Sequence, residues 1–177
     1  MNMQKVEIFY MYLNLLLIRH AKSSWSNHSL RDFDRPLNRR GKHNASLMGK
    51  RINGYEMQIE AIISSPAERA KETAKLIVKE VDLFAKRIGY ESRLYHASLD
   101  TFIKVLSDQK KENLMMVGHS PGIQEFSYWL CSEPRVNFPT CGAALISFNL
   151  QKWSELSRSC GTIISFEYPK MFYEKNI

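Results

Sequence analysis

One apolar segment constrains the fold of this chain more than any other, because it ends abruptly in two basic side chains. Residues 15–18 are Leu-Leu-Leu-Ile, and Arg19 and His20 follow directly. A strand with one face in water alternates apolar and polar residues, whereas a strand covered on both faces is apolar throughout. The segment therefore predicts a central strand of a parallel sheet covered by helices, with Arg19 and His20 at its carboxyl end.

Four other segments have the caps and the apolar spacing of helices. Ser65 and Glu68 form a capping-box pattern, with Pro66 at the first helical position. An apolar stripe extends this helix to Ile88, and Gly89 is a reasonable stop. The other three helices are predicted after Asn38, after Ser98 and over residues 123–130.

The strands and helices alternate along the chain. Residues 59–63 and 114–117 are predicted core strands, and residues 143–148 and 162–166 are predicted antiparallel neighbours. This order predicts an α/β fold, a three-layer sandwich with a mostly parallel central sheet and helices on both faces. At about 150 residues per domain we expect residues 1–177 to form a single domain. Residues 1–12 are then an N-terminal extension, as an added edge strand, a loose tail or the product of an upstream start site.

The charge of the chain indicates an anionic partner. The net charge is +7, and a positive field concentrates phosphate-bearing or acidic ligands. Lys and Arg are scattered, however, and the longest basic stretch is the short segment 37–42. By charge alone, nucleic acid, an acidic protein and a phosphoryl substrate, on a protein or a small molecule, all qualify, but without a longer basic block we expect no nucleic-acid partner.

The cysteines and the apolar segments indicate a cytoplasmic protein. Cys131, Cys141 and Cys160 are odd in number and have no C-x-x-C spacing, and residues 1–10 have no secretory pattern. These features fit reduced thiols better than disulfides. The apolar stretch around residues 13–18 is far too short to span a bilayer, so no membrane partner is expected.

Three predicted strands deliver basic side chains to one edge of the sheet. Arg19 and His20 follow the first strand, Arg69 lies one helical turn past the second, and His119 follows the third. Ligands of such sheets bind beyond the carboxyl ends of the strands. A guanidinium group is a planar fork that matches phosphoryl oxygens, and an imidazole is a donor or a nucleophile. Each residue alone is more often structural, but together they predict a phosphate site.

At these residues the chain resembles the histidine phosphatase superfamily, with its phosphoglycerate mutase-like fold, and more narrowly its short SixA-like phosphohistidine phosphatase branch. The similarity extends over about residues 15–148. Four segments carry it: residues 17–25 (LIRHAKSSW), 34–41 (DRPLNRRG), 64–74 (SSPAERAKETA) and 117–122 (VGHSPG).

The resemblance implies a role for each basic residue. His20 is the nucleophile that becomes phosphorylated, and Arg19, Arg69 and His119 hold the phosphoryl oxygens. Phosphoryl transfer independently requires an in-line nucleophile and neutralised equatorial oxygens. Ser23, or its neighbour Ser24, is a candidate hydroxyl donor to the phosphate.

The proton donor to the leaving group is harder to assign. Larger members of the family use a carboxylate for this purpose, and the candidates here are Asp32 and then Glu91. An imidazole leaving group, with a conjugate-acid pKa near ~6.5, departs more readily than an alkoxide and needs a weaker donor. We therefore expect phosphohistidine in a protein as the substrate, and a preference for P–N over P–O bonds.

Other functions are weighed against this hypothesis. The histidines lack metal-ligand spacing, so neither a metal nor a cofactor is expected, and His28, His43 and His96 are predicted to be exposed or locally bonded. Within the same fold the alternatives are a sugar-phosphate phosphatase and a mutase. From another class comes a non-catalytic module that recognises a phosphorylated partner, and a nucleic-acid binder ranks third.

Overall fold

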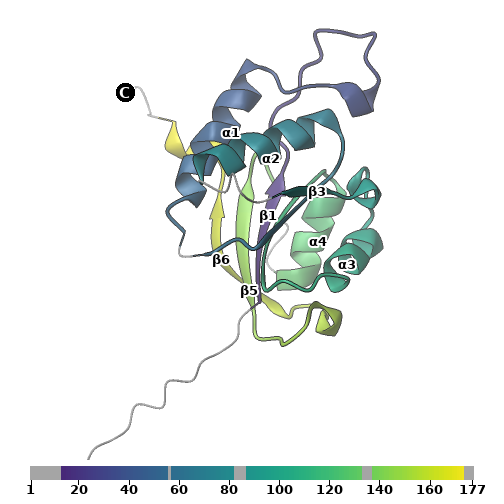
Figure 1. Ribbon diagram of the computed structural model, residues 1–177, viewed down its shortest axis with the longest axis vertical. Helices are drawn as coiled ribbons and strands as arrows, with labels where there is room; N and C mark the ends of the chain where they lie inside the picture. Colours follow the sequence, from purple (N-terminus) through teal and green to yellow (C-terminus); the bar gives the residue numbers. More distant parts are fainter. Residues whose placement is uncertain (1–12, 56, 82–86, 133–136, 174–177) are drawn as a thin grey trace, which may run out of the picture.

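A computed structural model describes residues 13–55, 57–81, 87–132 and 137–173 (Figure 1). Its centre is a six-stranded sheet in the order β3-β2-β4-β1-β5-β6. The strands are β1 (Leu13–Arg19), β2 (Ala61–Ser64), β3 (Ile88–Tyr90), β4 (Asn113–Gly118), β5 (Ala143–Phe148) and β6 (Gly161–Glu167). Among the described strands, β1, β2, β3 and β4 pair in parallel, whereas β5 is antiparallel to both β1 and β6. The predicted mixed, mostly parallel sheet is thus confirmed.

In the described part of the chain, four α-helices form the outer layers of the sandwich. They are α1 (Arg39–Ile52), α2 (Glu68–Glu80), α3 (Leu99–Ser107) and α4 (Gly122–Cys131). The side chain of Asn38 accepts a hydrogen bond from the Gly41 amide at the start of α1, and that of Ser98 accepts one from the Thr101 amide at the start of α3. Both predicted N-caps are therefore confirmed.

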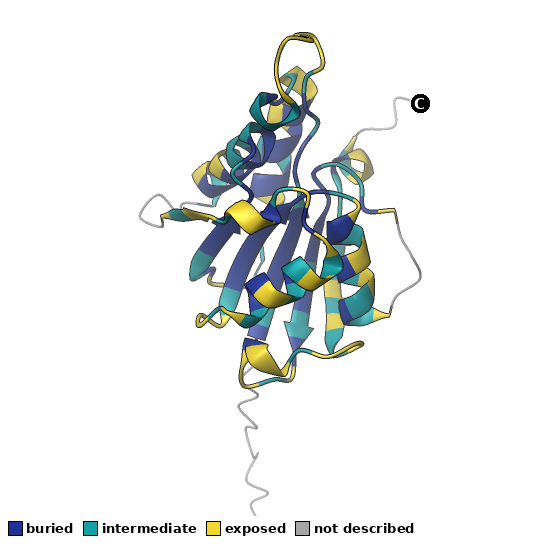
Figure 2. Cartoon of the chain, turned by 90° about the vertical axis from the view of Figure 1, so that its right-hand side faces the viewer, coloured by how far each residue is buried: buried dark blue, intermediate teal, exposed yellow. Residues whose placement is uncertain are grey.

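The apolar segment of β1 contributes to both halves of the core. Leu15 and Leu17 pack with side chains of α3 and α4, and Leu16 and Ile18 pack with those of α1 and α2. All four side chains are completely buried. Helices therefore cover both faces of the sheet, and Figure 2 shows the strands as a buried layer between them. Burial of each such side chain is worth about 1.5–3 kcal/mol.

The helix predicted from Ser65 to Ile88 differs at both ends from the structure. α2 begins at Glu68 with Ala67 as its N-cap, and the Ser65 hydroxyl accepts from the Ala67 amide just before the helix while it also contacts His119. At the other end α2 stops at Glu80, and Ile88 belongs to β3, where it pairs with Ile62 of β2. The apolar Ile88 continues the helical spacing by coincidence and packs as part of an edge strand.

The N-terminal extension lies outside the described residues, and its predicted alternatives stay open. In the described part of the chain, no helix has the length and apolar character needed to cross a bilayer.

Candidate active site

The carboxyl ends of neighbouring strands bring the predicted basic residues together. β1 and β4 are adjacent, so His20 after β1 and His119 after β4 lie side by side, with ring centroids 4.8 Å apart. Arg69, in the first turn of α2, places Nε 3.3 Å from Nε2 of His20. All three side chains are more than nine-tenths buried. The site is a compact, largely desolvated cluster of two imidazoles and a guanidinium group.

The hydrogen bonds of His20 determine which ring nitrogen carries the proton. Nδ1 lies 2.8 Å from the carbonyl oxygen of Ala21, which can only accept, so Nδ1 carries the proton. Nε2 in turn accepts from Nε–H of Arg69. The Ala21 amide is held by the hydroxyl of Thr73 in α2, and this contact fixes the turn that sets the ring orientation. His20 is therefore oriented with the unprotonated Nε2 toward Arg69.

The surroundings of His20 keep its imidazole neutral. Burial lowers the pKa of His20 to about 4, and the nearby charges of Arg69, Arg19 and Arg35 lower it further, against the opposing effect of the Ala21 hydrogen bond. Only the neutral ring has an electron pair to attack phosphorus. The nucleophilic form therefore predominates at neutral pH.

We expect the titration of His20 to show this effect directly. The imidazole should protonate near pH 4, because burial and the arginines destabilise its cationic form. A proton NMR titration measures the midpoint, with the resonance assigned by its loss in His20→Ala. A midpoint near the ordinary histidine value of about 6.5 would contradict this description of the site.

His119 has one engaged and one unengaged nitrogen. Its Nε2 lies 2.8 Å from the Ser65 hydroxyl, and no described residue offers a hydrogen-bond partner to its buried Nδ1. Burial, the neighbouring His20 and the charge of Arg69 lower the pKa of His119 to about 2. A neutral His119 whose Nε2 accepts from Ser65 carries its proton on Nδ1, where it is available to a phosphoryl oxygen.

Arg69 is held by the residue predicted as a proton donor. Its Nη2 donates to Oδ2 of Asp32 at 2.9 Å, and its Nη1 donates to the Asp32 backbone carbonyl. The hydroxyl of Tyr95 donates to the same Oδ2, also at 2.9 Å. Asp32 thus holds the guanidinium group of Arg69 in position through its carboxylate and its backbone carbonyl.

These contacts argue against a proton-donor role for Asp32. Burial would raise its pKa, but hydrogen bonds from Tyr95 and Arg69 and the charges of Arg69 and Arg35 outweigh burial and lower the pKa to about 2. Glu91, the second candidate, binds the amide and guanidinium of Arg93 instead, and these bonds lower its pKa. Both carboxyl groups are ionised at neutral pH and have no proton to give.

The variant Asp32→Asn distinguishes a residue that orients Arg69 from a residue that donates a proton to the leaving group. Asparagine keeps the shape and loses the charge that orients Arg69, so we expect a loss of about tenfold in kcat/KM, equal for P–O and P–N substrates. Steady-state kinetics on an alkyl phosphate and on a phosphohistidine peptide provide the comparison. A large loss confined to the alkyl phosphate would instead establish Asp32 as the acid.

Ser23 contacts an arginine that the sequence analysis did not single out. Arg35, from the segment DRPLNRRG, donates from Nη2 to the buried Ser23 hydroxyl at 2.6 Å and forms an ion pair with Asp32. Its guanidinium carbon lies 3.4 Å from the ring centroid of the exposed Trp25. The hydroxyl of Ser24 bonds instead to Ser26 in an exposed loop. Ser23 is therefore the better placed of the two serines, and Arg35 adds a third positive charge to the site.

Arg19 approaches the site from β1. Its Nη1 donates to the Phe138 carbonyl at 2.7 Å, and no described residue binds its buried Nε. Its charge contributes to the lowered pKa of His20. The structure therefore brings His20, Arg69 and His119 into contact, and Arg19 lies near enough for its charge to act on His20.

Two further side chains at the site were missed by the sequence analysis. Tyr95 binds Asp32, and its ring lies edge-on to His119 with centroids 5.7 Å apart. His96, predicted to be merely exposed or locally bonded, lies over His119 and beside Asp32. Both follow β3, so recognition of that strand would have marked the segment after it as a fourth strand exit.

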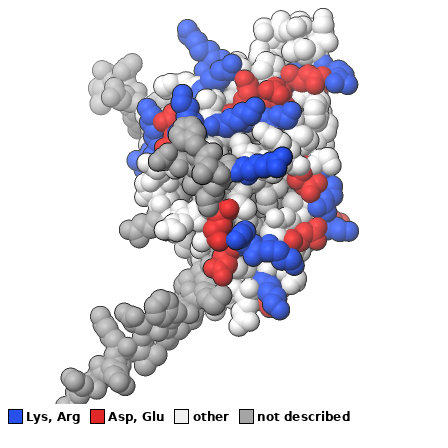
Figure 3. Space-filling model, viewed as in Figure 1, with Lys and Arg blue, Asp and Glu red and all other residues white. Residues whose placement is uncertain are grey.

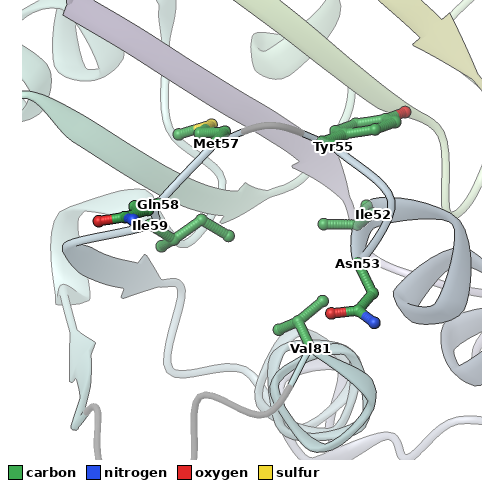
Figure 4. A pocket seen from close by; sticks show the side chains of 7 residues that line it. All are labelled: Ile52, Asn53, Tyr55, Met57, Gln58, Ile59 and Val81. Atoms are coloured by element: carbon green, nitrogen blue, oxygen red, sulfur yellow. The ribbon is translucent and has the colours of Figure 1, made fainter.

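A pocket elsewhere in the molecule has no such chemistry. Figure 4 shows this pocket of about 330 Å³, lined by residues 52, 53, 55, 57–59 and 81. It lies at the start of β2 and the ends of α1 and α2, away from the carboxyl edge of the strands, and its lining has neither arginine nor histidine. Among the described residues, no three metal-ligating side chains of the His, Cys, Asp and Glu types form a cluster.

On the face of the molecule shown in Figure 3, the positive side chains do not form a continuous patch. In the view of Figure 3, Lys and Arg side chains are interspersed with Asp and Glu. Several form ion pairs: Lys42 with Glu72, Arg51 with Glu167, Lys71 with Glu68, and Arg93 with Asp108. The absence of a nucleic-acid partner remains a prediction.

Comparisons with known proteins agree with the chemistry of the site. Residues 15–101 match the model of the histidine phosphatase superfamily, branch 1. An uncharacterized protein of Mycobacterium leprae is 31% identical over 168 residues, which cover 86% of this chain and 100% of the relative. The chain belongs to the histidine phosphatase superfamily. An uncharacterized chloroplastic protein of Arabidopsis thaliana, 31% identical over 151 residues, covers 80% of this chain, and the match spans 69% of that protein.

Solved structures identify the branch of the superfamily. The putative phosphohistidine phosphatase SixA of Agrobacterium tumefaciens is 25% identical, with a TM-score of 0.76 over 89% of this chain and 98% of its own. A tungstate complex of the protein histidine phosphatase SixA has a TM-score of 0.74 at 20% identity, with the same coverage. A mycobacterial glucosyl-3-phosphoglycerate phosphatase shares the fold with a TM-score of 0.60 at 14% identity. The fold is thus phosphoglycerate mutase-like, the branch is SixA-like, and the family is one of phosphatases.

Proposed function

We propose that this phosphatase hydrolyses protein phosphohistidine through a phosphoryl intermediate on His20. The observation that carries the proposal is the state of His20, a neutral imidazole with its proton on Nδ1 and the electron pair of Nε2 directed into the cluster. A module that only binds phosphate needs cationic groups and has no use for such a nucleophile. A sugar-phosphate phosphatase or mutase of the same fold would use His20 in the same way and differs in its leaving group.

In the first step Nε2 of His20 attacks phosphorus in line with the leaving group. The new P–N bond forms as the bond to the leaving group breaks, and the electron pair of that bond leaves with the departing atom. Arg19, Arg69 and His119 neutralise the charge spread over the equatorial oxygens. Because Arg69 contacts Nε2 of His20, its guanidinium group can bind a phosphoryl oxygen and orient the nucleophile at the same time.

In the second step water attacks the phosphorylated His20. The P–Nε2 bond breaks, its electron pair returns to Nε2, and inorganic phosphate leaves. The Ala21 carbonyl keeps its hydrogen bond with Nδ1–H throughout, so His20 returns to the tautomer in which it began. Neither step calls for a metal ion or a cofactor in this proposal.

The state of the carboxylates favours phosphohistidine as the substrate. An alkoxide is too basic to leave without a proton, whereas an imidazole, with a conjugate-acid pKa near ~6.5, is satisfied by a much weaker donor. The two carboxyl groups that were candidate donors are ionised and engaged with arginines. This supports a P–N bond as the one that is broken.

The substrate preference is tested with a pair of substrates and the purified protein. We expect kcat/KM for a phosphohistidine peptide to exceed that for a simple alkyl phosphate ester by about 100-fold or more, in line with the usual contribution of acid catalysis. Comparable values for the two would overturn the phosphohistidine assignment and favour a small-molecule phosphate ester. The His20→Ala variant serves as the blank for contaminating phosphatases.

A further inference from the structure

His96 lies where the proposed reaction needs a proton. Its Nε2 is 3.3 Å from Oδ2 of Asp32, and its ring stacks on that of His119, with centroids 6.0 Å apart and an angle of 25° between the planes. Tyr95 flanks it at 4.2 Å. The His96 side chain is 58% exposed, whereas His20 and His119 are buried. His96 is thus the outermost and most solvent-exposed histidine of the cluster.

The backbone holds His96 in this place at a cost. Its φ is 51°, in the left-handed region that few residues other than glycine adopt. The next residue, Ala97, packs closely against Gly122 in the segment after His119. The approach is so close that a Cβ on Gly122 would lie 2.0 Å from the carbonyl oxygen of Ala97. The Ser98 side chain then caps α3. Packing at Ala97 and the N-cap at Ser98 therefore hold this segment in place, and its turn directs the His96 ring toward His119.

We propose that His96 is the proton donor to the leaving group. The inference rests on the proposed function and deepens it. As Nε2 of His20 bonds to phosphorus, the P–N bond of the substrate breaks and its electron pair stays on the leaving nitrogen. That nitrogen takes a proton from the His96 imidazolium. In the second step the attacking water gives a proton to His96, phosphate is released, and the donor is restored.

The groups around His96 suit this role. The ionised carboxylate of Asp32 faces it from the segment before α1, the phenol of Tyr95 adjoins it, and the neutral His119 lies beneath it. Arg69 is turned toward Asp32, so the carboxylate stands between the guanidinium group and His96.

His96→Asn removes the proton donor and keeps the fold of the loop. Asparagine tolerates the left-handed backbone better than other residues except glycine, and its amide can still bind Asp32. At a pH of about 7.5 we expect kcat/KM for a phosphohistidine peptide to fall by about 100-fold. For p-nitrophenyl phosphate we expect a change of less than about threefold, because p-nitrophenolate leaves without a proton. At a pH of about 6 the loss on phosphohistidine should narrow, since solvent then protonates the leaving imidazole.

His43→Asn is the matched control. His43 is an exposed histidine on α1, and the same substitution there should leave both substrates unaffected. Equal losses on the two substrates in His96→Asn would show a structural role, and no loss on either would show no role, so each overturns the inference. If the wild-type protein cleaves p-nitrophenyl phosphate but not phosphohistidine, the proposed substrate fails as well. If the wild-type protein cleaves both substrates and the ratio of their kcat/KM values is unchanged in His96→Asn, the proposed function stands and only the role of His96 is rejected.

Discussion

Replacement of His20 by alanine is expected to abolish turnover while phosphate still binds. The substitution removes the nucleophile, and the three arginines and His119 remain to hold the anion. We expect kcat to fall by at least about 1000-fold, and the dissociation constant of phosphate to change by no more than about tenfold, or 1.4 kcal/mol. Steady-state kinetics and isothermal titration calorimetry with inorganic phosphate measure the two effects.

The control for this variant is His43→Ala, which removes an exposed imidazole from α1. It should retain both the rate and the affinity of the wild-type protein. Activity of His20→Ala within tenfold of wild type would mean that another group attacks phosphorus. A complete loss of phosphate binding together with a normal fold would mean that His20 serves mainly to bind.

Arg69→Ala is expected to have the next largest effect. Arg69 is 4% exposed and contacts both His20 and Asp32, so its loss removes positive charge from the transition state and releases the nucleophile from alignment. Removal of one such electrostatic contact typically costs about 10²–10³ in kcat. Stopped assays with the phosphohistidine peptide measure this loss.

Two further variants separate charge from geometry at this position. Arg69→Lys keeps the charge but loses the planar fork, so it should recover only part of the rate. Arg93→Ala removes a guanidinium that binds Glu91 and Asp108 at the surface, and it should be neutral for catalysis. The Arg69→Ala protein should still unfold cooperatively, since Asp32 is 42% exposed and can be solvated. Wild-type rates in Arg69→Ala would refute its role.

Much of this architecture can be predicted from the sequence because the strongest signals are local. The run at residues 15–18 is apolar throughout since both faces of β1 are covered, and its end marks the site directly. Asn38 and Ser98 mark helix starts because their side chains accept hydrogen bonds from amides three residues further along the chain. Such features depend on neighbours within a few residues, so they appear in the sequence without knowledge of the fold.

The rest depends on contacts between distant segments. Ser65 has the sequence neighbours of an N-cap, and its hydroxyl does accept from the Ala67 amide, but its contact with His119, 54 positions away, depends on the fold. Ile88 fits a helical stripe until its pairing with Ile62 of β2 is known. Because the sequence predicts the end of a helix where β3 lies, it does not mark the loop after β3 as a strand exit. Tyr95 and His96, which reach the site from that loop, were therefore missed.

The same reason explains the uncertain assignment of Asp32. Nothing in the sequence around Asp32 distinguishes its carboxyl group. Its lowered pKa and its contact with the guanidinium group depend on Arg69 and Tyr95, which lie 37 and 63 positions away. The charge state of a side chain is a property of its three-dimensional neighbours. A proton donor can thus be sought among nearby residues only after the fold is known.

We expect His20 to carry the phosphoryl group during turnover. Rapid mixing of the protein with a ³²P-labelled phosphohistidine peptide, followed by alkaline denaturation, tests it directly, because phosphohistidine survives base and is lost in acid. The predicted result is a base-stable, acid-labile label on the wild-type protein that maps to His20 by mass spectrometry and is absent from His20→Ala. Turnover of the peptide with no label on the protein, or a label on another residue, would contradict it.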